Sequence, residues 1–79
     1  MIWQIDLAII DPPRAGMGKM MPQLLLTRPA CLIMISCNPP TLARDIRPAI
    51  AEGYRITHTR VYDMFPQTEH AEVLVVLER

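Results

Sequence analysis

Cys37 is the residue whose type and position point most directly to chemistry. It follows an apolar run that predicts a buried strand, and it precedes a segment in which Thr41 is expected to cap a helix. Amide groups and the dipole at a helix N-terminus favour a thiolate, the nucleophilic form of cysteine, which suits addition to an electron-poor carbon. The alternative is a small buried apolar side chain, and that is our interpretation of Cys31.

Two carboxylates are further candidates. Asp11 ends an apolar run and precedes Pro12 and Pro13 in a rigid turn, where it either faces a cationic or hydroxyl-bearing ligand or caps the turn. Glu72 opens the last apolar run, where it is either a general base or an exposed acid at the end of a strand. His70 is a second possible base or a loop histidine.

The elements expected to position these residues alternate between strands and helices. Strands are predicted over residues 5–10, 30–36, 54–63 and 72–77, and helices over 17–28 and 41–52. The first strand is expected to be buried on both faces, whereas the third alternates polar and apolar residues, so one of its faces is expected to meet water. Pro22 is expected in the first turn of its helix. His58, on the third strand, is interpreted as structural.

The predicted order is therefore β-α-β-α-β-β, an α/β fold. Strands joined by a helix should form parallel pairs, and the last strand should be antiparallel because only a loop, residues 64–70, precedes it. Ligands of open α/β sheets bind beyond the carboxyl ends of the parallel strands. This topology predicts that Asp11, Cys37 and Glu72 gather at one rim of the sheet.

Composition narrows the class of protein. The chain has 79 residues, 51% of them hydrophobic, and no net charge. Because a surplus of positive charge supplies most of the affinity for phosphates, we expect any RNA substrate to be bound mainly by another part of the protein. The two cysteines form no disulfide framework or metal-ligand spacing, which indicates reduced thiols, no metal and a cytoplasmic location. We expect no signal peptide and no contact with a membrane.

Three ordered segments resemble those of one family. Asp11-Pro12-Pro13-Arg14-Ala15-Gly16 is similar to its DPPRxG motif, and residues 36–45 are similar to its SCNPxTLARD segment. Residues 63–72 are similar to its DxFPxTxHxE segment. The family is the RNA 5-methyluridine (uracil-C5) methyltransferases, which act on transfer or ribosomal RNA, and the wording of residues 63–66 leans towards the ribosomal branch.

The resemblance implies a role for each candidate. Cys37 matches the nucleophile that adds to C6 of uracil, Glu72 the base that removes the C5 proton, and Asp11 an acid in the S-adenosylmethionine site. Asn38 and Phe65 are candidates for positioning the target uracil. The basic residues Arg14, Arg44 and Arg47 are expected either to contact phosphates or to form surface ion pairs.

The family also has parts that this sequence lacks, including the glycine-rich cofactor loop and the N-terminal strands of its Rossmann-like sheet. Residues 1–79 are therefore expected to be the C-terminal part of a methyltransferase catalytic domain, inactive alone, whose first strand lacks a neighbour and favours self-association. The alternatives are a non-catalytic α/β binding module and a thiol hydrolase using His70.

Overall fold

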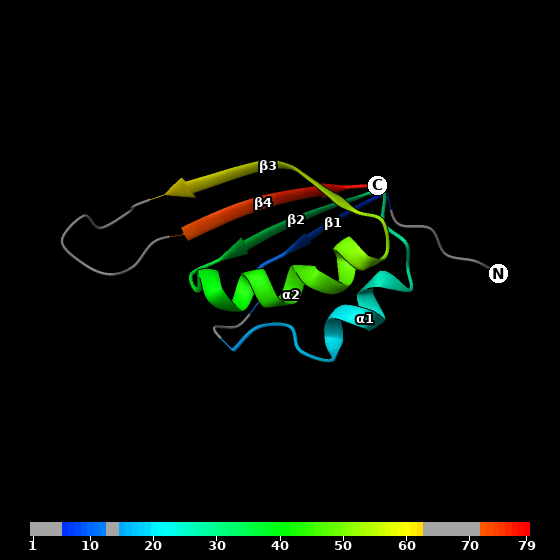
Figure 1. Cartoon of the computed structure of the whole chain (residues 1–79), viewed down its shortest axis with the longest axis horizontal. Coiled ribbons are helices and arrows are strands. Elements are labelled where there is room, and N and C mark those ends of the chain that lie inside the picture. Colours follow the sequence, from blue (N-terminus) through cyan, green and yellow to red (C-terminus); the bar gives the residue numbers. More distant parts are fainter. Residues whose placement is uncertain (1–5, 13–14, 63–71) are drawn as a thin grey trace.

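Within the part of the chain that the structure describes, four strands form one sheet with the spatial order β1-β2-β4-β3. The computed structural model describes residues 6–12, 15–62 and 72–79. Its strands and helices, in chain order, are β1 (Leu7–Ile10), α1 (Met20–Leu25), β2 (Cys31–Ser36), α2 (Pro39–Ala51), β3 (Arg55–Tyr62) and β4 (Glu72–Glu78) (Figure 1). The predicted α/β class and element order are confirmed.

The pairing of the strands is mixed. β1 and β2 are parallel, with Ile10 opposite Met34, and β4 is antiparallel to both β2 and β3. The predicted antiparallel final pair is confirmed. The expectation that the strands joined by α2 pair with each other is wrong, because β4 lies between β2 and β3. β4 has the alternating apolar pattern of a central strand, whereas the more polar β3 suits the edge.

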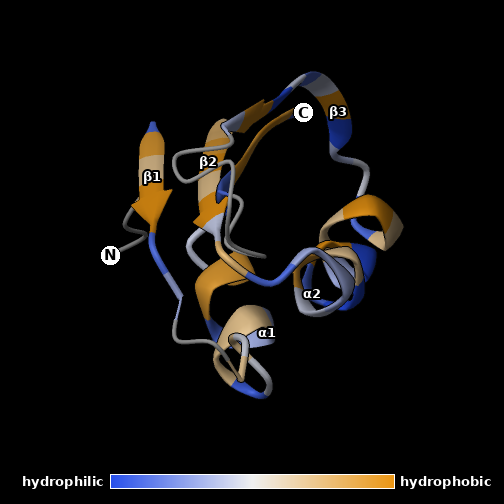
Figure 2. Cartoon of the chain, turned by 90° about the vertical axis from the view of Figure 1, so that its left-hand side faces the viewer, coloured by the Kyte–Doolittle hydropathy of each residue, from blue (hydrophilic) through white to orange (hydrophobic). Residues whose placement is uncertain are grey.

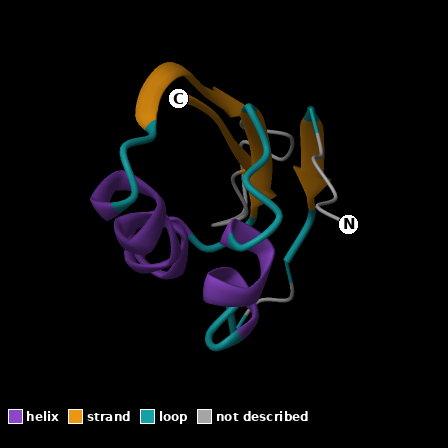
Figure 3. Cartoon of the chain, turned by 90° about the vertical axis from the view of Figure 1, so that its right-hand side faces the viewer, coloured by secondary structure: helices purple, strands orange, loops and turns teal. Residues whose placement is uncertain are grey.

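Both helices lie on the same face of the sheet (Figures 1 and 3). The core forms where this face meets the helices, and its buried members are Met21, Leu25, Leu32, Met34, Leu42, Ala49, Tyr54, Val73, Val75 and Leu77. Residues on β2 and β4 alternate between buried and half-buried because successive side chains point to opposite faces of a sheet. The second face of the sheet is not covered by either helix, although β1 and β2 are strongly apolar (Figure 2).

This one-sided architecture corrects two predictions. β1 is not buried on both faces, because Leu7 is 49% and Ile9 66% exposed on this strand, which lies at the edge of the sheet formed by the described residues. β3 is not half-buried either, since all eight of its residues are exposed and the pairing with β4 is irregular between Ile56 and His58. The apolar pattern identified both strands, but burial depends on what packs against them.

The helices differ from prediction mainly at their ends. α1 is shorter than the predicted 17–28 range, and Pro22 lies in its first turn, as expected. α2 begins at Pro39, and its N-cap is Asn38 rather than Thr41. No helix among the described ranges is long and apolar enough to cross a membrane.

Candidate active site

Asp11, Cys37 and Glu72 come from three different strands and lie at one end of the sheet. Asp11 directly follows β1, Cys37 directly follows β2, and Glu72 is the first residue of β4. Since β4 runs against β1 and β2, its beginning lies beside their carboxyl ends (Figure 1). The three candidates therefore share the rim at which α/β sheets bind their ligands.

The register relates Cys37 to Glu72 more closely. The last pair between β2 and β4 is Ser36 opposite Val73. Cys37 and Glu72 are the next residues beyond that pair, one on each strand. Residues in such neighbouring positions of an antiparallel pair have side chains within reach of each other.

A hydrogen-bonded turn presents Cys37. The buried Ser36 hydroxyl accepts a hydrogen bond from the backbone amide of Asn38 at 3.0 Å and donates one to its carbonyl oxygen at 3.3 Å. The Asn38 side-chain oxygen in turn accepts from the amide of Thr41 at 3.4 Å, which caps α2. Cys37 is exposed at the tip of this turn, at the N-terminus of a thirteen-residue helix.

Glu72 is half-buried at the start of β4, the strand next to β2. It pairs with Tyr62, the last residue of β3, whose side chain is 41% exposed. Tyr62 is not among the site residues predicted from the sequence. The sequence feature that could have identified it is an aromatic residue near the end of the predicted third strand, directly before the segment that leads to Glu72.

Asp11 is exposed, and the next residue, Pro12, is buried. A buried proline with a fixed φ anchors the chain directly after the carboxylate. An exposed carboxylate at the carboxyl end of a parallel strand fits a ligand that carries hydroxyl groups or a cationic amine.

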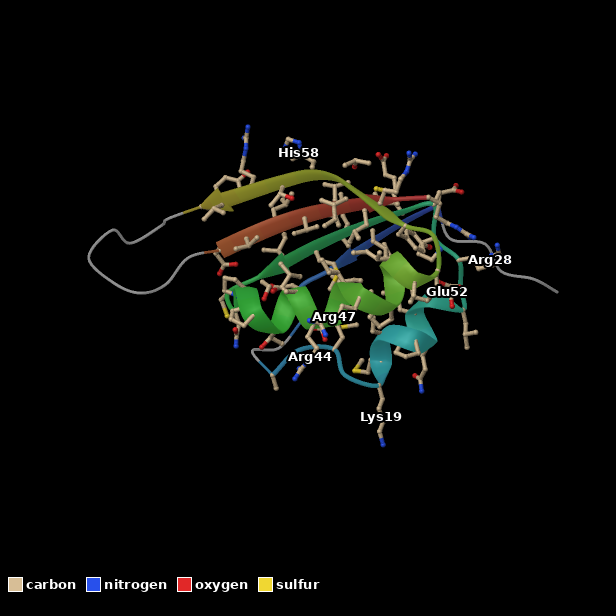
Figure 4. All side chains as sticks on the ribbon, in the orientation of Figure 1. Lys19, Arg28, Arg44, Arg47, Glu52 and His58 are labelled. Atoms are coloured by element: carbon tan, nitrogen blue, oxygen red, sulfur yellow. The ribbon has the colours of Figure 1, made fainter. Side chains whose placement is uncertain are left out.

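The arginines predicted from the sequence differ in their surroundings. Nη2 of Arg44 donates a hydrogen bond to the carbonyl oxygen of Ala15 at 2.9 Å, so this side chain contacts a loop. Arg47 is exposed on the same helix, and His58 is exposed on β3 (Figure 4). The predictions for Arg14, Phe65 and His70 fall outside the described residues.

The two cysteines have contrasting surroundings. Cys31 is half-buried and is the first residue of β2, where burial and then the charge of Glu78 raise the pKa of its thiol. Cys37 is exposed, and β2 separates the two, as expected. Within the described residues no group of three or more His, Cys, Asp or Glu side chains could hold a metal ion.

A cavity of about 430 Å³ lies away from this rim. Its lining includes Leu25 at the end of α1, Arg28 beyond it, Glu52 directly after α2, Tyr54 and Arg79. The Arg79 guanidinium lies over the Tyr54 ring at 5.5 Å, and the Tyr54 hydroxyl donates a hydrogen bond to the carbonyl oxygen of Pro29. The cavity is lined by none of Asp11, Cys37 and Glu72, so it does not coincide with the candidate site.

Comparison with known proteins gives one consistent family. The sequence model of the tRNA (uracil-5-)-methyltransferase family matches residues 2–79. A 23S rRNA (uracil(1939)-C(5))-methyltransferase RlmD from Shewanella piezotolerans is 43% identical over 95% of this chain and 17% of its own length. A 23S rRNA (uracil(747)-C(5))-methyltransferase RlmC from Shewanella halifaxensis is 45% identical over 91% of this chain and 19% of its own length.

A solved structure gives the same result. The crystal structure of the Pyrococcus abyssi tRNA (uracil-54, C5)-methyltransferase in complex with S-adenosyl-L-homocysteine superposes with a TM-score of 0.79 and 38% sequence identity. The match covers 96% of this chain and 19% of that chain. The sequence thus spans less than a fifth of the length of these relatives.

Proposed function

The chain belongs to the tRNA (uracil-5-)-methyltransferase family, and from this premise we propose that it forms the C-terminal part of a catalytic domain that methylates C5 of uridine in RNA. The observation that carries the proposal is the pairing of Ser36 with Val73, which leaves Cys37 and Glu72 as neighbours at the rim. A nucleophile and a base on adjacent strands suit a reaction that needs both at one pyrimidine ring.

Cys37 supplies the nucleophile. Its thiolate forms a bond to C6 of uracil, and the electron pair of the C5–C6 double bond moves towards C5 and the C4 carbonyl oxygen as an enolate. C5 thereby changes from a weak nucleophile to a strong one. The exposure of Cys37 at the rim supports this role.

Glu72 supplies the base. Once C5 carries the methyl group, its carboxylate takes the C5 proton, the double bond re-forms, and the Cys37 thiolate leaves C6. Half-burial of Glu72 on β4 supports a base that is partly shielded from water.

Asp11 is the residue of this chain proposed to hold the cofactor. S-adenosylmethionine, when bound, supplies the methyl group as an electrophilic sulfonium. The carboxylate of Asp11 is suited to accept hydrogen bonds from its hydroxyl or amino groups, because it is exposed at the carboxyl end of β1.

The substrate class is RNA. The named relatives act on ribosomal or transfer RNA, and a base in either must leave its stack to reach a pocket at the rim. Because the chain has no net charge, we assign most of the phosphate contacts to other parts of the enzyme, which would work in the cytoplasm.

The proposal is tested by methyl transfer in the full-length enzyme that contains this chain. We expect 5-methyluridine to form in RNA from labelled S-adenosylmethionine, and we expect Cys37→Ala to abolish it. Cys31→Ala is the matched control, because it removes a half-buried thiol away from the rim and should retain activity. Full activity of Cys37→Ala would overturn the proposal.

One observation favours a second candidate, a non-catalytic module that associates with itself. β1 is an edge strand that pairs only with β2 among the described strands, and Leu7 and Ile9 are exposed on it. An unpaired apolar edge is a site for association with another strand. This candidate and the enzyme differ in one readout, since only the enzyme needs the Cys37 thiol.

A further inference from the structure

Asp45 is a buried carboxylate that neither the apolar core nor the proposed chemistry explains. It lies on α2 with 3% of its surface exposed. Its Oδ2 accepts a hydrogen bond of 2.7 Å from the backbone amide of Met17, which is 28 positions away in the sequence. A charge is costly to bury unless it is hydrogen-bonded, so this contact with a loop is a specific feature of the fold.

The loop residue before Met17 also touches α2 closely. Gly16 has a φ of +93°, and a Cβ atom at this position would lie 2.4 Å from Cγ2 of Thr41 and 2.8 Å from Oδ2 of Asp45. Both the backbone conformation and the lack of space therefore require glycine here. The main chain of the loop lies directly on the helix.

Three consecutive residues, Ala15, Gly16 and Met17, thus meet α2. We call them the 15–17 loop. The helix residues that contact them are Thr41, Arg44 and Asp45, whose spacing of three and four places them on one side of the helix. Figure 4 shows Arg44 on the side of α2 that faces away from the sheet.

The helix therefore supports two parts of the candidate site. α2 begins two residues after Cys37, and the 15–17 loop begins four residues after Asp11. The nucleophile Cys37 lies just before the N-terminus of this helix, and the 15–17 loop packs along its side. The helix therefore fixes the position of Asp11 relative to Cys37.

We propose that Asp45 is a positioning residue that holds the 15–17 loop on α2 and so sets the place of Asp11 relative to Cys37. This inference rests on the proposed function, in which Asp11 binds the cofactor and Cys37 attacks the uracil ring. It predicts that loss of the Asp45 contact weakens use of the cofactor without impairing the chemistry of Cys37.

Two reactions of the full-length enzyme separate these effects. Methyl transfer needs both sides of the site. Exchange of the C5 hydrogen with solvent needs the Cys37 thiolate and the Glu72 carboxylate but not the cofactor. Cys37 adds to C6, C5 accepts a proton from solvent, Glu72 removes the original proton, and Cys37 leaves. This exchange balances without a cofactor, so tritium release from 5-tritiated uridine RNA can be measured in its absence.

The expected result for Asp45→Ala is a rise of about tenfold in the KM for S-adenosylmethionine, while cofactor-free exchange stays within about twofold of wild type. Asp45→Asn keeps an oxygen acceptor for the Met17 amide and should recover most of the loss. Arg44→Ala should raise this KM by a smaller factor. Arg47→Ala is the matched control, because Arg47 is an exposed arginine on the same helix, and it should not change the KM for S-adenosylmethionine.

Two results would overturn the inference. Equal losses of methyl transfer and exchange in Asp45→Ala would indicate a general structural role, and unchanged values for both would indicate none. If Asp45→Ala does not fold, the comparison of Arg44→Ala with Arg47→Ala decides, and equal KM values in these two variants would contradict the proposal. Failure of the proposed function is distinct, because the wild-type enzyme would then show no methyl transfer.

Discussion

Ser36 of β2 lies opposite Val73 of β4, and this pair fixes the relation between the two residues that follow it at the rim. Because side chains alternate along a strand, a slip of one residue in this register would move Glu72 to the other face. The buried alternation of Leu32 and Met34 on β2 with Val75 and Leu77 on β4 opposes such a slip. The apolar core therefore sets the geometry of the proposed nucleophile and base.

Replacement of the proposed base should arrest the reaction after methylation. In Glu72→Gln the C5 proton is not removed, so Cys37 stays bonded to C6, and turnover should fall by about 10²- to 10⁴-fold. A protein–RNA complex that survives denaturing electrophoresis should accumulate on ordinary uridine RNA. Glu78→Gln, at the exposed far end of the same strand, should behave as wild type. Normal turnover of Glu72→Gln would assign the base to another residue.

Substitution of Gly16 should cost more stability than substitution of another glycine with positive φ. Gly53 has a φ of +104° and nothing within 4 Å of an added Cβ, so Gly53→Ala should cost only the backbone strain, about 1 kcal/mol. Gly16→Ala adds the clash with Thr41 and Asp45 and should cost about 1–3 kcal/mol more. Urea unfolding measures both, and equal costs would show that the loop can leave α2 without penalty.

Stability should fall in alkaline solution through Cys31. Its thiol has a pKa raised above the ordinary 9.0, first by burial and then by the charge of Glu78. Above pH 9.0 the folded state thus retains a thiol proton that the unfolded state releases. The contribution of Cys31 to the free energy of unfolding is therefore complete below pH 9.0 and is lost as the pH rises through the pKa of the folded state.

Urea unfolding between pH 7 and 11 measures this effect, and Cys31→Ala should reduce the slope of the free energy of unfolding against pH above pH 9. Burial likewise raises the pKa of Tyr54, which adds a loss in the same direction above its ordinary 10.0 in all variants. An unchanged slope in Cys31→Ala would exclude Cys31 as its source.

The exposed edge strand predicts self-association of the 79-residue chain. Ile9 is 66% exposed on β1, and a lysine there should reduce strand addition and lower the apparent mass in sedimentation at high concentration. Ile50→Lys is the control, since Ile50 is 47% exposed on α2, away from the edge. A concentration-independent monomer before any substitution would contradict the prediction.

The sequence predicted the element order and the shared rim because both follow from local signals. Apolar runs that end at Asp11 and Cys37 mark strand ends, and chain direction then places those ends together. The position of β4 between β2 and β3 depends on long-range pairing, which no local pattern contains. Burial of β1 was overestimated because apolar residues indicate a preference for burial and not the presence of a covering layer.

Local hydrogen bonding explains the other differences. Asn38 replaces Thr41 as the cap of α2 because the turn that bonds it to Ser36 brings its side chain to the helix end. Asp45 was part of a recognised segment but had no predicted role. Its signal was a charged residue between Leu42 and Ala49 on the buried side of the helix, although the loop that it meets could be found only from the structure.

The most direct test of the central claim locates the covalent bond. RNA with 5-fluorouridine at the target position cannot lose a proton from C5, so the methylated adduct should remain attached to the enzyme. After incubation of the full-length enzyme with this RNA and S-adenosylmethionine, mass spectrometry should find the nucleotide on the peptide that contains Cys37. An adduct on any other residue, or methylation that proceeds in Cys37→Ala, would contradict the account.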